Sequence, residues 1–299
     1  MSYDLYFTGE RIPKAEFDSY FRGRKRYELN ESQAWYSNDD SGVYFSFEYS
    51  DDDSGEDLEW ESFAAFNQNY YRPHFFALEA ERELTAFVAN FGCTVADPQN
   101  GGMGEGAYTS EGFLQGWNHG NKCGYSAILS SEDAPEEVLC RPTAELEAIW
   151  RWNYTREQIS ESLGMDIFVP RIMFMMIAGL LKSVCVWPDA ISILMPKTDM
   201  VYSPRSELAP KRFLRKKEDD YCIIDQSTLD GVLSDFDSTF PLPARHPHSE
   251  TLPIGVREFV QNRPPHEGEV SGVALDGVLN AEYVTEFQNG NNKRMESND

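Results

Sequence analysis

Short runs of aromatic and β-branched residues, separated by turn-forming segments, dominate the first hundred residues of this 299-residue chain. Such runs favour β-strands, and the polar, glycine-containing segments between them favour tight turns. Strands are predicted at residues 3–7 and 43–49, with residues 38–42 as the turn of a hairpin. Helical spacing of apolar residues interrupts this pattern twice, after Pro13 and over residues 73–91. The order of these elements predicts an α+β fold in which helices cover one face of an antiparallel sheet, as in a split βαβ sandwich.

The length of the chain predicts two domains, because single hydrophobic cores stop growing at about 250–300 residues. The glycine-rich residues 100–106 form the predicted boundary. They lack the Lys-Ser/Thr pair and the spacing of a phosphate-binding loop, which favours a linker or turn. We therefore expect an N-terminal sandwich domain over residues 1–100 and a second, mixed α+β domain with an antiparallel sheet over residues 107–280. Residues 281–299 are polar and are expected to form a flexible tail.

Within the second domain, the sequence predicts a group of helices followed by a strand-rich block. Thr109 and Ser110 are possible caps of a helix that reaches Trp117, and a second helix spans residues 142–152. A third helix is predicted to begin at Thr155 and to end at a glycine. Strands are predicted within residues 167–177, 183–187, 191–195, 200–203 and 221–224, and a late helix at 254–261.

The charge of the chain is strongly negative. It contains 50 acidic and 26 basic residues, for a formal net charge of −24. A field of that sign repels nucleic acid and anionic lipid, and it speeds encounters with basic partners. No Lys or Arg lies between Tyr27 and Tyr71, a stretch that also contains aromatic residues of the kinds that anchor protein interfaces. This stretch therefore indicates where a basic partner would bind.

The candidate partner-binding site is a short acidic segment within that stretch, together with the tryptophan near its end. It consists of Asp51, Asp52, Asp53, Glu56, Asp57, Glu59, Trp60 and Glu61. An acidic loop beside an aromatic anchor is typical of a surface that docks a basic protein. A solvated hairpin loop would have the same composition, so both interpretations stay open. The spacing lacks the alternating ligands and the terminal Glu of an EF-hand loop, so the segment does not predict a calcium site.

The sequence carries no recognised catalytic, metal or cofactor motif. Its five histidines are not part of a GxSxG or HExxH signature. Five cysteines occur without a CxxC pair, which argues against a disulfide framework and a zinc site. They are Cys93, Cys123, Cys140, Cys185 and Cys222. His119, next to Gly120, is the best single candidate for chemistry, although such a residue is also typical of helix capping or packing. We therefore expect a protein that is not an enzyme and that binds no cofactor and no metal.

Location and assembly are predicted from the apolar and basic segments. The first ten residues lack the basic and apolar parts of a signal peptide, and residues 172–181 are about half as long as a bilayer-spanning helix. The basic run at 211–217 is followed directly by three acidic residues, which favours a self-compensating surface over a nucleic-acid contact. We expect a cytoplasmic protein that contacts neither membrane nor nucleic acid and is a monomer or weak dimer.

Three short motifs resemble those of the immunity proteins of bacterial polymorphic and type VI secreted toxins. They are Tyr3-Asp-Leu-Tyr-Phe7 at the start, the Gly116-Trp117 pair, and Trp187-Pro188 after a hydrophobic segment. The pattern is most similar to the immunity family that is paired with restriction-endonuclease-fold nuclease toxins. This resemblance implies stoichiometric inhibition, in which the protein binds a toxin domain and blocks its active site or its assembly without chemistry.

A nuclease toxin has a basic substrate groove, and an acidic loop that occupied the groove would mimic DNA, in agreement with the charge of this chain. Two other classes of protein remain as alternatives. An enzyme of an unrecognised family would show a deep pocket with convergent polar groups, and a scaffolding protein would show a homo-oligomeric interface.

Overall fold

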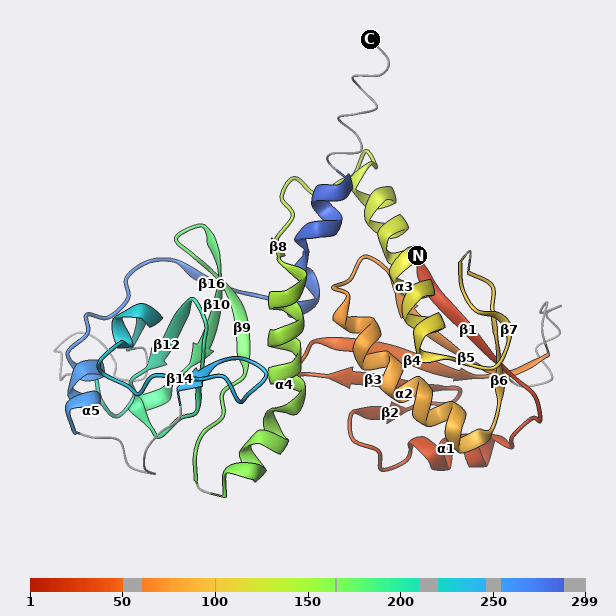
Figure 1. Ribbon diagram of the computed structural model, residues 1–299, viewed down its shortest axis with the longest axis horizontal. Coiled ribbons are helices and arrows are strands. Elements are labelled where there is room, and N and C mark those ends of the chain that lie inside the picture. The colour runs from red at the N-terminus through yellow and green to blue at the C-terminus, as the bar shows by residue number, and fades with distance from the viewer. Residues whose placement is uncertain (51–60, 100, 165, 210–219, 246–253, 288–299) are drawn as a thin grey trace, which may run out of the picture. The chain divides into compact units, whose positions relative to one another are not determined.

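The computed structural model describes residues 1–50, 61–99, 101–164, 166–209, 220–245 and 254–287. They form a mixed α+β structure, which confirms the predicted fold class. The chain divides into two units (Figure 1). The first unit comprises Met1–Leu146 and Asp276–Asp299, and the second comprises Glu147–Leu275. The chain therefore leaves the first unit once and returns to it near its C-terminal end.

An antiparallel sheet of seven strands, in the order β2-β3-β4-β5-β1-β6-β7, forms the first unit. Its strands are β1 (Ser2–Thr8), β2 (Tyr27–Leu29), β3 (Gln33–Asn38), β4 (Val43–Tyr49), β5 (Ser62–Asn69), β6 (Thr94–Asp97) and β7 (Gly104–Gly106). The predicted hairpin is β3–β4. Helices α1 (Lys14–Phe21), α2 (Phe75–Phe91) and α3 (Ser110–Leu129) pack on one face of the sheet.

Aromatic rings fill the space between this face and the helices. Successive side chains of a strand point to opposite faces of the sheet, so the alternating rings of each strand gather on one side. Phe87 of α2 lies 4.5 Å from Phe7 and 4.9 Å from Phe47 between ring centroids. Tyr36 stacks on Phe45 at 4.3 Å. Burying each such ring contributes roughly 1.5–3 kcal/mol to the stability of the fold. The apolar side of each long strand therefore packs against the helices.

Helix α2 also buries a carboxylate against the same face. Glu79 is fully buried, and its Oε1 accepts hydrogen bonds from the Tyr36 hydroxyl at 2.7 Å and the Asn38 amide at 2.6 Å. Burial and the Glu79 carboxylate both raise the pKa of Tyr36, which keeps the phenol protonated as a donor. These directional contacts fix the position of β3 against α2 more specifically than ring packing alone could.

Asn280 holds the segment that returns to the first unit. This residue lies in β17 (Leu279–Asn280), which pairs in parallel with β8 (Cys140–Arg141). The amide oxygen of Asn280 accepts from the backbone N–H of His74 at 2.9 Å, and its amide nitrogen lies 2.9 Å from Nδ1 of His74. The same nitrogen donates to Oγ1 of Thr143 at 2.8 Å. Thr143 begins helix α4 (Thr143–Leu163), so one buried side chain joins the starts of two helices to the returning segment.

The division into units differs from the one expected at residues 100–106. Gly104–Gly106 forms strand β7, which pairs with β6 and continues the sheet. The cause is Asp97, whose carboxylate accepts hydrogen bonds from the Tyr3 hydroxyl and from the backbone N–H groups of Gln99 and Met103. A Cβ atom on Gly102 would overlap this carboxylate, so a glycine is required where the turn closes on it. The glycine at position 102 therefore lets the backbone of the turn approach the Asp97 carboxylate closely within the first unit.

Several other elements differ from the predictions. Helix α3 continues beyond Trp117 to Leu129, and α4 is one helix where two were predicted. Helix α4 ends before Gly164, which has the left-handed φ of 60° that favours glycine. Residues 281–287 of the predicted tail are helical, and residues 288–299 lie outside the described residues.

The second unit is built on a sheet in the order β13-β12-β10-β9-β16. Its strands are β9 (Ile172–Ile177), β10 (Leu180–Val186), β12 (Met200–Pro204), β13 (Tyr221–Asp225) and β16 (Val270–Val273). β10 and β12 pair in parallel and the other neighbours are antiparallel, so this sheet is mixed where an antiparallel one was expected. The connection from β10 to β12 is long enough for a parallel crossover, which needs about a dozen residues.

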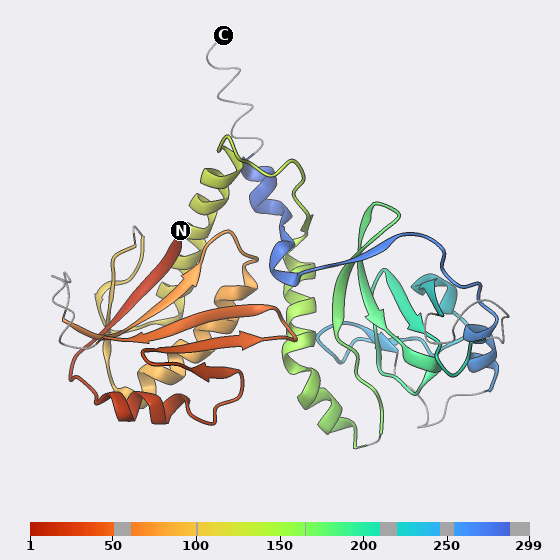
Figure 2. The same cartoon turned by 180° about the vertical axis from the view of Figure 1, so that it is seen from behind.

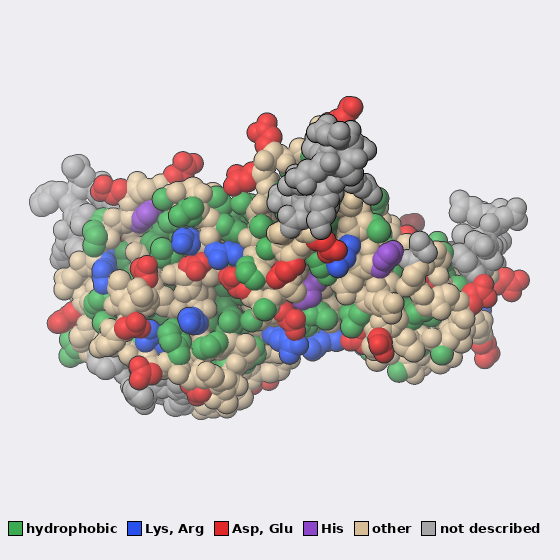
Figure 3. Space-filling view, turned by 45° about the horizontal axis from the view of Figure 1, so that its top comes forward, with side chains coloured by type: hydrophobic (Ala, Val, Ile, Leu, Met, Phe, Trp, Pro, Cys, Tyr) green, Lys and Arg blue, Asp and Glu red, His purple; other side chains and the backbone are tan. Residues whose placement is uncertain are grey.

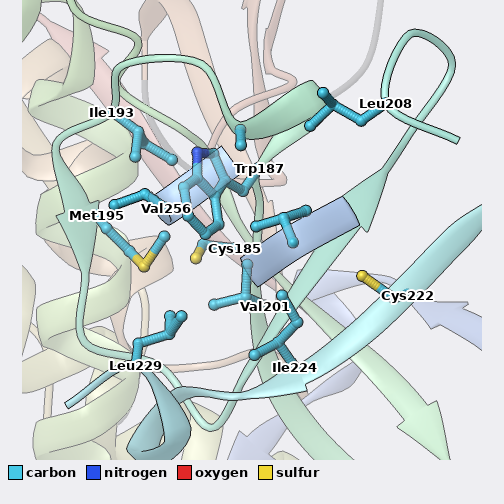
Figure 4. Close-up of a cluster of buried hydrophobic side chains, with 12 residues drawn as sticks. Cys185, Trp187, Ile193, Met195, Val201, Leu208, Cys222, Ile224, Leu229 and Val256 are labelled. Atoms are coloured by element: carbon cyan, nitrogen blue, oxygen red, sulfur yellow. The ribbon is translucent and has the colours of Figure 1, made fainter. Parts of the chain in front are cut away.

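Shorter elements complete the second unit. They are η2 (Pro188–Ala190), β11 (Met195–Pro196), η4 (Gln226–Leu229), β14 (Phe236–Asp237), β15 (Ala244–Arg245) and α5 (Ile254–Gln261), and η5 (Leu275–Gly277) leads back to the first unit. Figure 4 shows the core of this unit, in which Trp187 lies among Cys185, Met195 and Val256. Nε1 of Trp187 donates to the Ile191 carbonyl at 2.8 Å. Burial raises the pKa of Cys185 to about 12, which keeps this thiol protonated and unreactive.

Replacing Glu79 by Ala should leave the Tyr36 hydroxyl and the Asn38 amide without their buried acceptor. We expect the free energy of unfolding to fall by about 2–4 kcal/mol, measured by urea denaturation. Asn90→Ala, at an exposed position of the same helix, is the control and should change it by less than about 0.5 kcal/mol. Equal stability of the two variants would contradict this role of Glu79.

Replacing Asn280 by Ala should loosen the returning segment, because the His74 N–H then loses its buried acceptor. We expect a loss of about 2–4 kcal/mol in the unfolding free energy and faster amide exchange at Leu279. The matched control is Thr285→Ala, an exposed position of the same segment. Unchanged exchange at Leu279 would show that β17 is held by other contacts.

Candidate functional site

The side of the seven-stranded sheet opposite the helices carries polar, acidic and aromatic side chains, and is termed the open face. In Figure 2 the strands of the first unit lie in front of α2 and α3, so this side is toward the viewer. The strand alternation assigns to it Asp4, Tyr6, Glu28, Gln33, Trp35, Tyr44, Ser46, Glu48 and Asn67. The open face exists because the buried rings of the same strands all point the other way.

Trp35 is the exposed aromatic anchor of the open face. It keeps 38% of its surface exposed, whereas the other tryptophans that the structure describes, Trp117, Trp150, Trp152 and Trp187, are buried. Its ring stacks on Tyr44 with 5.7 Å between centroids and 19° between planes. Trp35 lies directly opposite Glu28 on β2 and Ser46 on β4. An exposed Trp held rigidly in a sheet has the properties of an interface hot spot.

The carboxylates of the open face have no cationic partner among the residues that the structure describes. Glu28 is exposed, and Glu48 accepts a hydrogen bond from the Gln33 amide at 2.8 Å. Asp4 accepts from the Asn67 amide at 2.6 Å. No Lys, Arg or His occurs in any of the seven strands. The negative charge of the face is therefore not compensated within the sheet.

Tyr6 on the face and Arg72 at its border provide hydrogen-bond donors. Desolvation, together with the Asp4 carboxylate, raises the pKa of Tyr6, so its phenol remains a hydrogen-bond donor at neutral pH. Arg72 lies with its guanidinium 5.6 Å from the Tyr44 ring centroid, and its Nε donates to the Tyr44 hydroxyl at 2.8 Å. Nε of Arg72 is also 3.7 Å from the Asp276 carboxylate, which offsets the charge of this arginine.

The site predicted from the sequence lies next to this face in the chain. Asp51, Asp52, Asp53, Glu56, Asp57, Glu59 and Trp60 lie outside the described residues. Glu61 is described, is exposed, and directly precedes β5. Residues 50–61 connect β4 to β5, two neighbouring strands of the open face. Sequence reasoning did not select Trp35, although the alternation of buried Ala34 and Tyr36 with polar neighbours was the signal that could have identified it.

A hollow of about 670 Å³ in the second unit is a further candidate site. It is lined by Arg156, Glu157, Ser160, Asp166, Ile167, Phe168, Val169, Ala190, Ile191, Ser192 and Arg257. Its two arginines are matched by two acidic residues. The lining contains no His or Cys, so neither a Ser–His nor a Cys–His pair can form among these residues. The hollow therefore offers a mixed polar and apolar surface rather than an assembled nucleophile.

The histidine and acidic groups considered for chemistry are dispersed in the structure. His119 is exposed in the middle of α3, beside the Gly101 turn, because the helix runs on past the end predicted for it. Within the described ranges, no three His, Cys, Asp or Glu side chains are arranged to hold a metal ion. On the side of the molecule seen in Figure 3, acidic side chains are spread out rather than gathered in one patch. On this side of the molecule, charge alone therefore does not single out a site.

Comparison with models of protein families, with curated proteins and with solved structures gives no match. Among the described residues, none of the helices combines the length and the apolar character needed to cross a membrane.

The sign of the potential at the open face can be measured by ionic quenching of Trp35 fluorescence. In a Trp60→Phe variant, the ratio of caesium quenching to iodide quenching of this emission at low ionic strength should be roughly two- to fivefold above the ratio that the same ions give with free N-acetyltryptophanamide, because the local field attracts cations. The difference should shrink as salt is added. The control carries Trp35→Phe as well, and its remaining emission should not distinguish the two ions. A caesium-to-iodide quenching ratio equal to that of free N-acetyltryptophanamide at low salt would contradict a negative open face.

Proposed function

We propose that this protein is a non-catalytic immunity protein that binds and neutralises a secreted toxin by covering a basic surface of the toxin with the open face. The observation that supports it is the sheet itself, which exposes Trp35 and places no basic residue in any of its seven strands. The basic substrate groove of a nuclease toxin is complementary to such a surface in charge.

Two properties of the open face favour tight association. Its side chains stand on a hydrogen-bonded sheet, so little conformational entropy is lost when a partner binds. Glu48 is already oriented by the Gln33 amide, and Trp35 by stacking on Tyr44. The carboxylates would steer the encounter, and the aromatic anchor would slow dissociation. Inhibition then needs no chemistry, because a bound partner cannot admit its own anionic substrate.

The test uses the product of the gene that neighbours this one as the candidate toxin, with its nuclease activity and its binding kinetics as readouts. One variant combines Glu28→Gln with Glu48→Gln. Its control combines Glu161→Gln with Glu258→Gln, two exposed positions of the second unit, and has the same net charge. We expect the first variant alone to slow association about three- to tenfold at low salt and to flatten the salt dependence.

Trp35→Ala should act on dissociation instead, with a rate about tenfold or more above that of the unmodified protein. Circular dichroism must first show that each variant is folded. If the two charge variants associate equally fast, the open face is not the steering surface. If the unmodified protein neither binds nor inhibits the toxin, the immunity function itself is wrong.

The acidic loop provides an independent arm of the same test. Replacing Asp51, Asp52, Asp53, Glu56 and Asp57 together by Asn or Gln should slow association further if the loop extends the open face. An unchanged association rate would restrict the interface to the strands and to the residues that the structure places on them.

A further inference from the structure

The immediate surroundings of Trp35 contain the parts of an arginine site. One side of its indole ring is stacked on Tyr44, and 38% of the side chain remains exposed. Glu28, the residue directly opposite on β2, is exposed and forms no hydrogen bond or ion pair with another described residue. Cross-strand neighbours in an antiparallel pair have Cβ atoms about 4.5–5.5 Å apart. An exposed aromatic ring and an unpaired carboxylate therefore lie within reach of one incoming side chain.

The chain binds its own arginines with this same pair of groups. The guanidinium of Arg24 lies 4.6 Å from the ring centroid of Tyr20, and its Nη2 is 2.6 Å from the Glu83 carboxylate. In the second unit, the guanidinium of Arg245 lies 4.1 Å from the Phe236 centroid and is paired with Asp230.

Arg72 repeats the arrangement beside the open face, over Tyr44 and near Asp276. Each of these three sites combines a ring, a carboxylate and an arginine of the chain itself. Around Trp35 and Glu28 the ring and the carboxylate are present, but no arginine of the described chain lies over the indole. The missing component is the one that a partner could supply.

The chemistry of this pair favours arginine over lysine. A guanidinium is planar and weakly hydrated, so it can stack on an indole while its N–H groups donate to a carboxylate in the same plane. The ammonium of lysine is a compact and strongly hydrated charge, which gains less from the ring and cannot form a bidentate pair. A surface selected for charge alone would not distinguish the two.

We propose that the open face recognises its partner through an arginine whose guanidinium stacks on Trp35 and pairs with Glu28. This inference rests on the proposed binding of a basic protein surface and names the partner group that the face selects. The occupant is therefore an arginine-bearing protein segment rather than a lysine-rich one.

The test measures binding of two peptides of equal length and charge, one alternating Arg with Gly and the other alternating Lys with Gly. The protein carries Trp60→Phe, so that a change of fluorescence on binding can be assigned to Trp35 by its loss in the Trp35 variants, and calorimetry gives the affinities. We expect the arginine peptide to bind roughly three- to tenfold more tightly at low ionic strength. Trp35→Leu should remove this preference but keep the weaker binding that both peptides owe to charge. Trp35→Phe, which keeps a ring in place, should retain part of it.

Glu28→Gln should weaken the arginine peptide more than the lysine peptide, whereas Glu161→Gln in the second unit should affect neither. If both peptides bind the Trp35 protein equally well, the arginine site is wrong and binding of a basic partner still stands. If the preference persists in Trp35→Leu, the arginine is bound elsewhere. If neither peptide binds at low ionic strength, both the arginine site and the open face as a docking surface for basic partners are overturned.

Discussion

The packing of α2 and α3 on only one side of an antiparallel sheet determines the rest of the first unit. Because strand side chains alternate, each strand ring that points toward the helices has a neighbour in the chain that points away from them. Those neighbours are Asp4, Glu28, Trp35 and Glu48, among others. The same alternation that builds the core thus produces the acidic surface proposed for function. The parity of a strand residue therefore indicates whether its side chain points toward the helices or toward the open face.

A second constraint is that the first unit is made from two separate parts of the chain. The contact between His74 and Asn280 joins residues 206 positions apart. Glu282 adds to it by accepting hydrogen bonds from the backbone and the side chain of Thr143 at the start of α4. Desolvation alone would raise the pKa of Glu282, but the bonds from Thr143 and the charge of His74 outweigh it and lower the pKa. The ionised carboxylate therefore caps α4 and complements its helix dipole at neutral pH.

The two units offer different surfaces to other molecules. The hollow of the second unit is lined by acidic and basic residues in equal number, which compensate one another. The open face of the first unit has carboxylates and aromatic rings without compensating cations in its strands. The proposed recognition of a partner thus depends on charge complementarity rather than on the size of a cavity.

The sequence by itself determined the elements whose signals are local. The alternation around β1, the turn between β3 and β4, and the end of α2 at Gly92, where φ is 63°, all depend on residues a few positions apart. Together they predicted the α+β class and a sheet covered by helices on one side. The acidic character of the 27–71 stretch was likewise evident from composition.

The tertiary structure decided the features that depend on contacts between residues far apart in the chain. The glycine-rich residues 100–106 were predicted to be a linker or turn, but the hydrogen bonds of Asp97 with Tyr3 and Met103 hold this turn against the sheet. Residues 281–299 were predicted to be a tail, but the contact between Asn280 and His74 ties the start of this segment to the first unit. The parallel pairing of β10 with β12 and the exposure of Trp35 are also set by which elements pack on which side. Hydrophobic periodicity specifies which face of an element is buried, but the choice of partner is made by contacts between residues far apart in the chain, which no local pattern encodes.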